Sequence, residues 1–190
     1  WLHSDYIDHL RLWKARYEDF EISTDSECGF YLEAKGTWLN TSMYEIPVLA
    51  IINEVYFRMS YDYDKLFEQY KRKLEEKTGW LISGKYNLGN FSEFGLRRRL
   101  SAQAQELAVE TLIKHNPEYK ESRCVGTSNV YLAKKFNVTP VGTMAHEFIM
   151  CVGQGDPMYN PAFSNKLAME AWTKEYGVLN GTYLTDTIGE

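Results

Sequence analysis

Cysteine is scarce in this sequence. Its three cysteines, Cys28, Cys124 and Cys151, are widely spaced among 190 residues and form no Cys-x-x-Cys pair. This argues against a disulfide framework and a structural zinc site, and it favours reduced thiols in a cytoplasmic protein. Long hydrophobic runs are also lacking. The longest, around residues 46–52, is far shorter than the roughly 20 residues of a membrane helix, so we expect a soluble chain with no membrane partner.

Positive charge is in deficit, with 21 lysines and arginines against 26 acidic residues and a net charge of −5. An acidic chain is a poor candidate for a nucleic-acid-binding surface, although a local basic cluster can lie within it. Apolar residues are plentiful at 44%, which is enough to bury the core of one domain, or of one domain and part of another. We therefore expect a globular chain.

The first 82 residues predict helices around one strand. Aromatic and leucine side chains recur every three or four residues between positions 6 and 20, which indicates an amphipathic helix or helix pair. Apolar and polar residues alternate over residues 30–34, which predicts a strand. The apolar spacing then predicts a helix over residues 43–58. A charged helix should follow over residues 62–78, and Gly79 should end it.

From residue 91 strands and helices alternate, a pattern typical of parallel sheets and barrels. The expected strands cover residues 91–97, 123–127, 139–143 and 181–187. The expected helices start after the N-caps Ser101 and Asn129, after the GTMAHE segment, and at Asn160–Pro161, the last with a buried face of Phe163, Leu167, Ala171 and Trp172 and a stop at Gly177.

Ligands bind beyond the carboxyl ends of parallel strands, so the residues after each expected strand are candidate site residues. Taken singly, an arginine run is often a solvated surface and a Gly-Thr pair is often a turn. Their occurrence at equivalent junctions favours a site instead, and arginine forks suit planar carboxylates and phosphates. The junctions present Phe94, Gly95 and Arg97–Arg99, then Thr127–Asn129, then Thr143 and His146, then Asp186 and Thr187.

These segments resemble the nicotinate phosphoribosyltransferase family of type II phosphoribosyltransferases. The resemblance is carried by EFGLRRR at 93–99, by GTSN to GTMAHE at 126–147, by GTYLTDT at 181–187 and by residues 36–54. It implies an α/β fold that is part of an irregular β/α barrel, preceded by the end of a small α/β sandwich domain. Residues 1–45 would belong to the N-terminal sandwich domain, residues 46–82 would be linking helices, and residues 83–190 would be the first half of the barrel. Family members are considerably longer, so we expect an internal fragment.

The resemblance also implies an activity, the ATP-coupled synthesis of nicotinate mononucleotide from nicotinate and phosphoribosyl diphosphate in NAD salvage. ATP would phosphorylate His146, which Glu147 or a nearby carboxylate could orient, and Mg²⁺ would bind together with phosphoribosyl diphosphate. Nicotinamide-using relatives carry an aspartate at the place of Ser128, so the serine favours nicotinate. No protein residue is assigned as a metal ligand in its own right, and the full-length protein would be a homodimer.

The expected substrate-binding residues are Phe94, Gly95, Arg97, Ser128, Thr143 and Asp186. The resemblance implies stacking on the pyridine ring for Phe94, binding of the diphosphate or the nicotinate carboxylate for Arg97, selection for nicotinate by Ser128, a hydrogen bond to nicotinate from Thr143, and binding of ribose hydroxyls or the metal shell by Asp186. The alternative is a noncatalytic relative that binds a nucleotide or an anion as a regulatory module.

Overall fold

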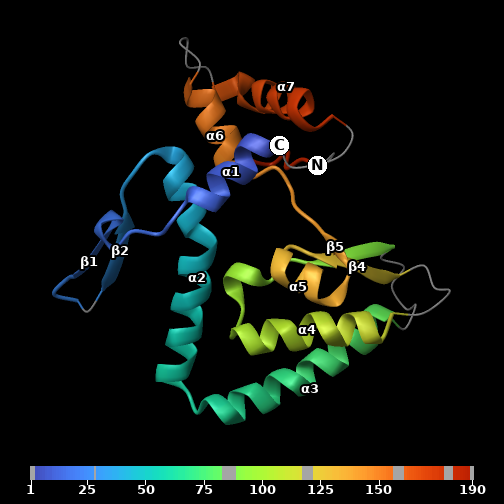
Figure 1. The fold of residues 1–190 in the computed structure, drawn as a ribbon. Coiled ribbons are helices and arrows are strands. Elements are labelled where there is room, and N and C mark those ends of the chain that lie inside the picture. The colour runs from blue at the N-terminus through green and yellow to red at the C-terminus, as the bar shows by residue number, and fades with distance from the viewer. Residues whose placement is uncertain are drawn as a thin grey trace. The chain divides into compact units, whose positions relative to one another are not determined.

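A computed structural model describes residues 3–27, 29–82, 89–116, 122–155, 161–177 and 182–188 (Figure 1). The chain divides into two compact units. The first unit comprises residues 4–140, and the second comprises residues 141–190 together with residues 1–3. Each unit has its own internal packing.

The first unit combines helices with two small sheets. Its elements are α1 (Ser4–Leu12), the 3-10 helix η1 (Tyr17–Asp19), β1 (Phe20–Thr24), β2 (Phe30–Ala34), α2 (Trp38–Ser60), α3 (Tyr63–Ile82), β3 (Asn90–Glu93), the 3-10 helix η2 (Leu96–Arg98), α4 (Ala102–Lys114), β4 (Arg123–Thr127), α5 (Val130–Phe136) and β5 (Thr139–Pro140). The second unit contains α6 (His146–Gly155), the 3-10 helix η3 (Pro161–Phe163) and α7 (Ser164–Tyr176).

The aromatic residues that come after α1 pack around Tyr44 of α2. The ring centroids of Trp13 and Phe20 lie 5.2 and 4.6 Å from that of Tyr44. The Tyr44 hydroxyl donates a hydrogen bond to Asp19 Oδ2 at 2.5 Å. The helix expected over residues 6–20 is therefore wrong beyond α1. Its aromatic residues do pack, but Phe20 begins β1, because backbone pairing with the antiparallel β2 favours extended chain there.

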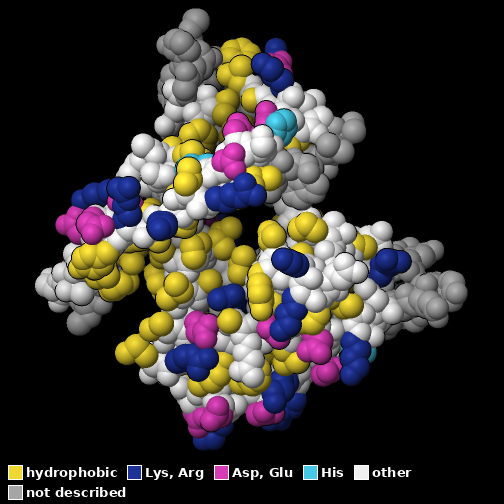
Figure 2. Space-filling view, viewed as in Figure 1, with side chains coloured by type: hydrophobic (Ala, Val, Ile, Leu, Met, Phe, Trp, Pro, Cys, Tyr) yellow, Lys and Arg dark blue, Asp and Glu magenta, His cyan; other side chains and the backbone are white. Residues whose placement is uncertain are grey.

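The strand predicted over residues 30–34 is confirmed as β2, and the helix predicted over residues 43–58 is confirmed within the longer α2. Hydrophobic side chains gather over α2 in Figure 2, and Ile51, Val55 and Met59 are 59%, 47% and 82% exposed. Within the described part of the chain, no helix combines the length and the apolar character needed to cross a membrane.

Helix α3 confirms the prediction for residues 62–78 but continues through Gly79 to Ile82. A glycine inside a helix costs only about 1 kcal/mol relative to alanine, which neighbouring contacts can offset. One such contact joins α3 to α4, where the Tyr70 hydroxyl donates to the carbonyl of Ala104 at 3.0 Å. Burial raises the pKa of Tyr70 to about 12, so the hydroxyl keeps its proton.

The three-stranded sheet has the order β3-β4-β5, and both pairings are parallel. The strand predicted over residues 123–127 is confirmed as β4. The strands expected over residues 91–97 and 139–143 are shorter than predicted. The first ends at Glu93, where the chain turns into η2, and the second ends at Pro140, which has no N–H to continue a ladder.

Helices α4 and α5 cover this sheet, and both start at the predicted N-caps. Ser101 Oγ accepts from the N–H of Ala104, and Asn129 Oδ1 accepts from the N–H groups of Tyr131 and Leu132. The side chains that these helices bury are mostly small or branched, so the helices can lie close to the strands. The buried apolar residues here are Ala104, Ala108, Val109, Leu112, Cys124, Leu132 and Ala133.

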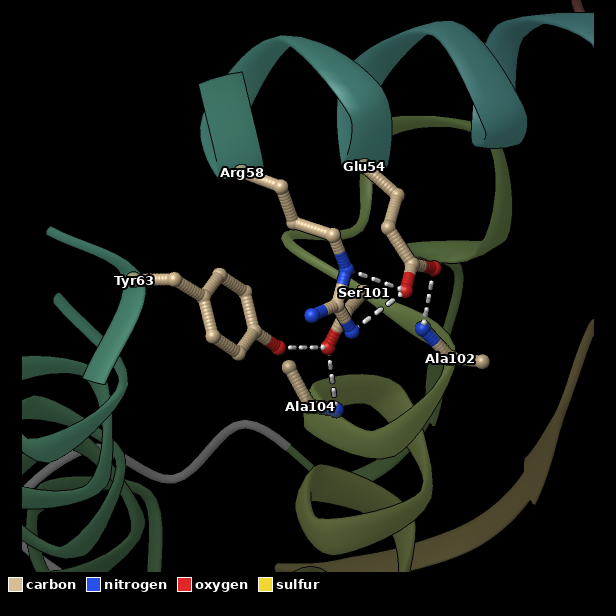
Figure 3. Close-up of polar contacts among 6 residues, drawn as sticks. All are labelled: Glu54, Arg58, Tyr63, Ser101, Ala102 and Ala104. Carbon is tan, nitrogen blue, oxygen red and sulfur yellow. Dashed lines mark hydrogen bonds and ion pairs between the residues drawn. The ribbon is translucent and has the colours of Figure 1, made fainter. Parts of the chain in front are cut away.

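A polar cluster joins α2, α3 and the start of α4 (Figure 3). Glu54 Oε2 accepts from the N–H of Ala102 at 2.9 Å, and Glu54 Oε1 accepts from Arg58 at 2.9 and 3.1 Å. The Tyr63 hydroxyl donates to Ser101 Oγ at 2.5 Å. Burial raises the pKa of Glu54, but the hydrogen bonds from Ala102 and Arg58 outweigh burial and leave that pKa below its ordinary value.

The second unit has a small core of Met144, Ile149 and Ala168, all fully buried. Helices α6 and α7 approach closely at Gly153. A Cβ added to Gly153 would lie 1.7 Å from Ser164 Oγ, so no other residue fits without moving a helix. The helix predicted after GTMAHE is confirmed as α6.

The helix stop at Gly177 is confirmed, since its N–H donates to the carbonyl of Thr173 at 2.8 Å. The helix start at Asn160–Pro161 is confirmed in part, because Pro161 opens η3 and Asn160 lies outside the described residues. The expected buried face is wrong at Phe163, which is 51% exposed, and at Ala171, which is also exposed. Residues 161–163 form a 3-10 turn with three residues per turn, so the α-helical stripe starts one position later. That stripe buries Ser164 and Ala168 and partly buries Trp172.

The strand expected over residues 181–187 is wrong for the described residues 182–188, which form no strand; Gly181 lies outside the described residues. A strand requires a paired neighbour, whereas this segment bonds to the helices and to the residues before α6. The carbonyl of Thr182 accepts from Met144 N at 3.2 Å, and the carbonyl of Thr185 accepts from Asn165 Nδ2 at 3.4 Å.

We expect Ser101→Ala to lower the free energy of unfolding by about 2 kcal/mol, because Ala104 loses its cap and the Tyr63 hydroxyl loses its acceptor. Tyr63→Phe is the matched variant and should cost about 1 kcal/mol. The double variant should lose less than the sum, since both changes remove the same hydrogen bond. Urea denaturation measures all three, and wild-type stability in Ser101→Ala would contradict the expectation.

Candidate active site

The expected site residues divide between the two units. Phe94, Gly95, Arg97 and Ser128 belong to the first unit, and the second set consists of Thr143, His146 and Asp186. Within each unit the structure shows which side chains come together.

The turn after β3 presents Phe94 and Arg97 at the surface of the first unit. Phe94 is 50% exposed, so its ring can receive a planar ligand. Gly95 lies close to the Glu93 side chain, because its N–H donates to Glu93 Oε1 and an added Cβ would lie 2.5 Å from that oxygen, so a larger residue would displace the carboxylate. The chain then closes into η2, where Arg98 N donates to the carbonyl of Gly95. Arg97 therefore lies within η2, three residues after Phe94.

Helix α2 holds this turn through two contacts with Arg97. Arg97 Nη1 forms an ion pair with Glu45 Oε1 at 2.5 Å, and Asn53 Nδ2 donates to the carbonyl of Arg97 at 2.8 Å. Both members of the ion pair remain partly exposed, at 49% and 42%. The three arginines do not act as one cluster, because Arg99 reaches inward to Gln105 Oε1 at 3.4 Å.

Ser128 lies in the turn after β4, at the same edge of the sheet as the arginine turn. The two turns are joined directly, because Ser128 N donates to the carbonyl of Glu93 at 2.9 Å. Ser128 is half-buried, while its neighbours Thr127 and Asn129 are buried. The expectation that the ends of these two strands meet is therefore confirmed.

His146 is the first residue of α6, and its Nε2 lies 2.9 Å from Asp186 Oδ1. The imidazole is 47% exposed and the carboxylate 71% exposed. The hydrogen bond from His146 lowers the pKa of Asp186, with a smaller contribution from its own backbone N–H, so the carboxylate is ionised and only accepts. Thr143 is half-buried and lies three residues before His146, in chain without regular structure.

Sequence patterns did not identify two of these contacts. Asp186, assigned to ribose or metal, also contacts the imidazole, a role expected of Glu147 or another carboxylate. Glu45 pairs with Arg97 across 52 positions, and no local spacing signals such a pair.

The described residues contain no group of three His, Cys, Asp or Glu side chains that could hold a metal ion. A magnesium ion bound through substrate phosphates needs only one or two protein carboxylates, because it keeps several waters. The exposed Asp186 supplies one such carboxylate, so the residues present fit an ion that arrives with a diphosphate.

Together these features define an α/β protein with a small parallel sheet whose strand ends carry groups suited to aromatic and anionic ligands. A model of the nicotinate phosphoribosyltransferase (NAPRTase) family matches residues 90–190. The chain is 41% identical over 161 residues to nicotinate phosphoribosyltransferase of Saccharomyces cerevisiae, covering 81% of this chain and 35% of the relative. It is 35% identical over 192 residues to the Neisseria gonorrhoeae enzyme of that name, covering 98% of this chain and 46% of the relative.

Solved structures agree with the sequence relatives. The fold matches a nicotinate phosphoribosyltransferase from Porphyromonas gingivalis with a TM-score of 0.73 at 29% identity, over 92% of this chain and 42% of that one. It also matches one from Saccharomyces cerevisiae with a TM-score of 0.72 at 36% identity, over 93% and 44%. The chain belongs to the nicotinate phosphoribosyltransferase family, and it spans less than half the length of these relatives.

The His146–Asp186 contact makes a prediction that requires no substrate. We expect His146→Ala to raise the pKa of Asp186 toward its ordinary value, because the charged carboxylate loses the hydrogen bond that favours it. Carboxyl carbon chemical shifts measured against pH report this pKa. His115→Ala, which removes a ring bonded to the Thr111 carbonyl, is the control and should leave it unchanged. An Asp186 pKa that is the same with and without His146 would show that the contact does not form in solution.

Proposed function

We propose that a protein containing this chain joins nicotinate to the ribose of phosphoribosyl diphosphate and couples the reaction to ATP hydrolysis through a phosphohistidine at His146. The product would be nicotinate mononucleotide, in NAD salvage. Family membership supports the reaction class. The single observation that carries the ATP coupling is the contact between His146 Nε2 and Asp186.

That contact supports Nδ1 of His146 as the nucleophilic atom. An ionised carboxylate only accepts hydrogen bonds, so His146 Nε2 carries the proton and, in the neutral ring, Nδ1 carries the free electron pair. Nδ1 would attack the γ-phosphorus of ATP, the bond to the bridging oxygen would break, and ADP would leave. Asp186 would stabilise the positive charge that grows on the ring. The half-exposed imidazole leaves room for an incoming phosphate.

The glycosyl transfer would use the turns of the first unit. Phe94 would stack on the pyridine ring, a contact that contributes about 0.5 to 1.5 kcal/mol beyond its buried area. As the pyridine nitrogen bonds to C1 of the ribose, the C1–oxygen bond breaks and negative charge grows on the diphosphate. Arg97 would stabilise that charge, and loss of such a donor costs roughly 3 to 4 kcal/mol. Mg²⁺, when bound with the diphosphate, would neutralise part of the same charge.

Ser128 would set substrate choice, because it would leave space without negative charge where a carboxylate must fit. The fitting partners are nicotinate, phosphoribosyl diphosphate and ATP. We also propose that the protein at its natural length is a homodimer, and the exposed apolar side chains of α2 are typical of an interface.

Incubation of the protein at its natural length with γ-labelled ATP should place the label on His146. His146→Ala should abolish labelling, while His115→Ala, a histidine bonded to the Thr111 carbonyl, should retain it. Asp186→Asn should slow labelling, because a neutral amide stabilises the charged ring less well. Acid-labile, base-stable label measured by phosphopeptide analysis checks the assignment. Absence of label in the wild type would favour the noncatalytic nucleotide- or anion-binding relative.

Nicotinate, and not nicotinamide, should raise the thermal unfolding midpoint in the presence of phosphoribosyl diphosphate. A ligand at 100 times its Kd stabilises the folded protein by about 2.7 kcal/mol, which a thermal shift assay resolves easily. Ser128→Asp should reduce the shift with nicotinate by repulsion between carboxylates, and Ser128→Ala is the uncharged control. A larger shift with nicotinamide in the wild type would reject the role of Ser128.

A further inference from the structure

We infer that Glu93 is a positioning residue that fixes the arginine turn (residues 94–98) and the serine turn (residues 127–129) relative to each other. The inference rests on the proposed function, since these turns carry the residues proposed to bind nicotinate and the diphosphate. Glu93 itself is the last residue of β3 and is half-buried.

Glu93 is bonded to both turns at once. Its Oε1 accepts from the N–H of Gly95 in the arginine turn. Its Oε2 accepts from Thr127 Oγ1 at 2.7 Å in the serine turn, and its backbone carbonyl accepts from Ser128 N at 2.9 Å. Phe94 and Arg97 leave the chain one and four residues after this anchor. A change in the carboxylate would therefore move both sets of ligand-binding groups.

A ring of buried and partly buried hydrogen bonds holds the carboxylate in place. Gln105 Nε2 of α4 donates to Glu93 Oε2 at 3.2 Å, and Gln105 Oε1 accepts from Asn129 Nδ2 at 3.0 Å. Asn129 N donates to Thr127 Oγ1 at 3.1 Å, and Thr127 returns to Glu93. Thr127, Gln105 and Asn129 are 0%, 2% and 8% exposed, so little water competes for these bonds.

The three groups that donate to the Glu93 side chain favour a carboxylate at position 93. Gly95 N, Thr127 Oγ1 and Gln105 Nε2 all donate to Glu93, which takes part as an acceptor in each bond. A glutamine has the same shape but carries one oxygen and one NH₂ group. With its NH₂ at the Oε1 position the amide faces the Gly95 N–H, and the arginine turn loses its anchor. With its NH₂ at the Oε2 position the amide faces the Gln105 NH₂, and the ring that holds the side chain is broken.

A purely structural carboxylate would behave differently. Glu54 is the matched case in the same unit, since it also accepts from a backbone N–H, that of Ala102, and is 22% exposed at its side chain. Its hydrogen bonds go to Arg58 and Ala102, so they stabilise the start of α4 and involve neither turn. Loss of Glu54 should lower stability without changing the relation between the two turns.

The test compares Glu93→Gln, Glu54→Gln and the double variant Glu93→Gln/Gln105→Glu in the protein at its natural length. Steady-state kinetics give kcat and KM for nicotinate and nicotinamide, and urea denaturation gives stability. We expect Glu93→Gln to lower kcat/KM for nicotinate about 100-fold, the usual effect of misplacing binding groups by about 1 Å. Its KM for nicotinate should rise, and its preference over nicotinamide should shrink. Glu54→Gln should lose stability and keep the wild-type KM and preference.

The double variant tests the donor arrangement itself. A carboxylate at position 105 accepts from the amide introduced at position 93 and still accepts from Asn129, so part of the KM change should be restored. Wild-type KM and preference in Glu93→Gln would overturn the inference, and so would an equal change in Glu54→Gln at matched loss of stability. If Glu93→Gln does not fold, the double variant decides, and failure of both to fold assigns Glu93 a structural role only. A wild-type protein inactive on nicotinate refutes the proposed function instead.

Discussion

The hydrogen bonds that the Glu93 carboxylate accepts hold together the arginine turn and the serine turn of the first unit. Parallel pairing of β3 and β4 brings their carboxyl ends to one edge, but pairing alone does not orient the turn after each strand. The carboxylate adds that orientation, because its lone pairs take one N–H from the arginine turn and one hydroxyl from the serine turn. Strand pairing brings the two turns close together, and the Glu93 carboxylate orients them.

Arg97 shows how the acidic character of the chain is compatible with binding an anion. Its guanidinium presents five N–H donors, and Glu45 occupies one nitrogen, Nη1. The ion pair is half-exposed and therefore contributes little to stability, but it keeps the long side chain in one region. Under the proposed function, an arriving carboxylate or diphosphate would meet an arginine that contacts with α2 already hold in place. Less conformational entropy would then be lost on binding.

The second unit provides a different kind of site. Its core of Met144, Ile149 and Ala168 is small, and α6 and α7 approach each other closely at Gly153. His146 opens α6, while Asp186 lies on a segment with no strand partner among the described residues, anchored by hydrogen bonds at Thr182 and Thr185. The pair is exposed, which is compatible with the proposed transfer of a phosphoryl group from a nucleotide.

The sequence by itself determined the elements whose signals are local. Alternation predicted β2, helical periodicity predicted α2, and the caps Ser101 and Asn129 marked the starts of α4 and α5, because a cap bonds to an N–H two or three residues away. Local signals also placed Phe94 and Ser128 directly after strands, where the structure has them following β3 and β4. The same signals overextended the strands after Glu93 and Pro140, where the chain turns for reasons that periodicity does not carry.

Only the tertiary structure decided the contacts between distant positions. The aromatic residues up to residue 20 have helical spacing, yet they do not form one helix. Trp13 follows α1 and Phe20 begins β1, and both rings pack against Tyr44 of α2. Asp186 reaches His146 across 40 positions. Glu93 meets Thr127 across 34 positions. Hydrogen bonds and packing act through space, so a pattern along the chain shows which groups are present, and the fold determines which of them meet.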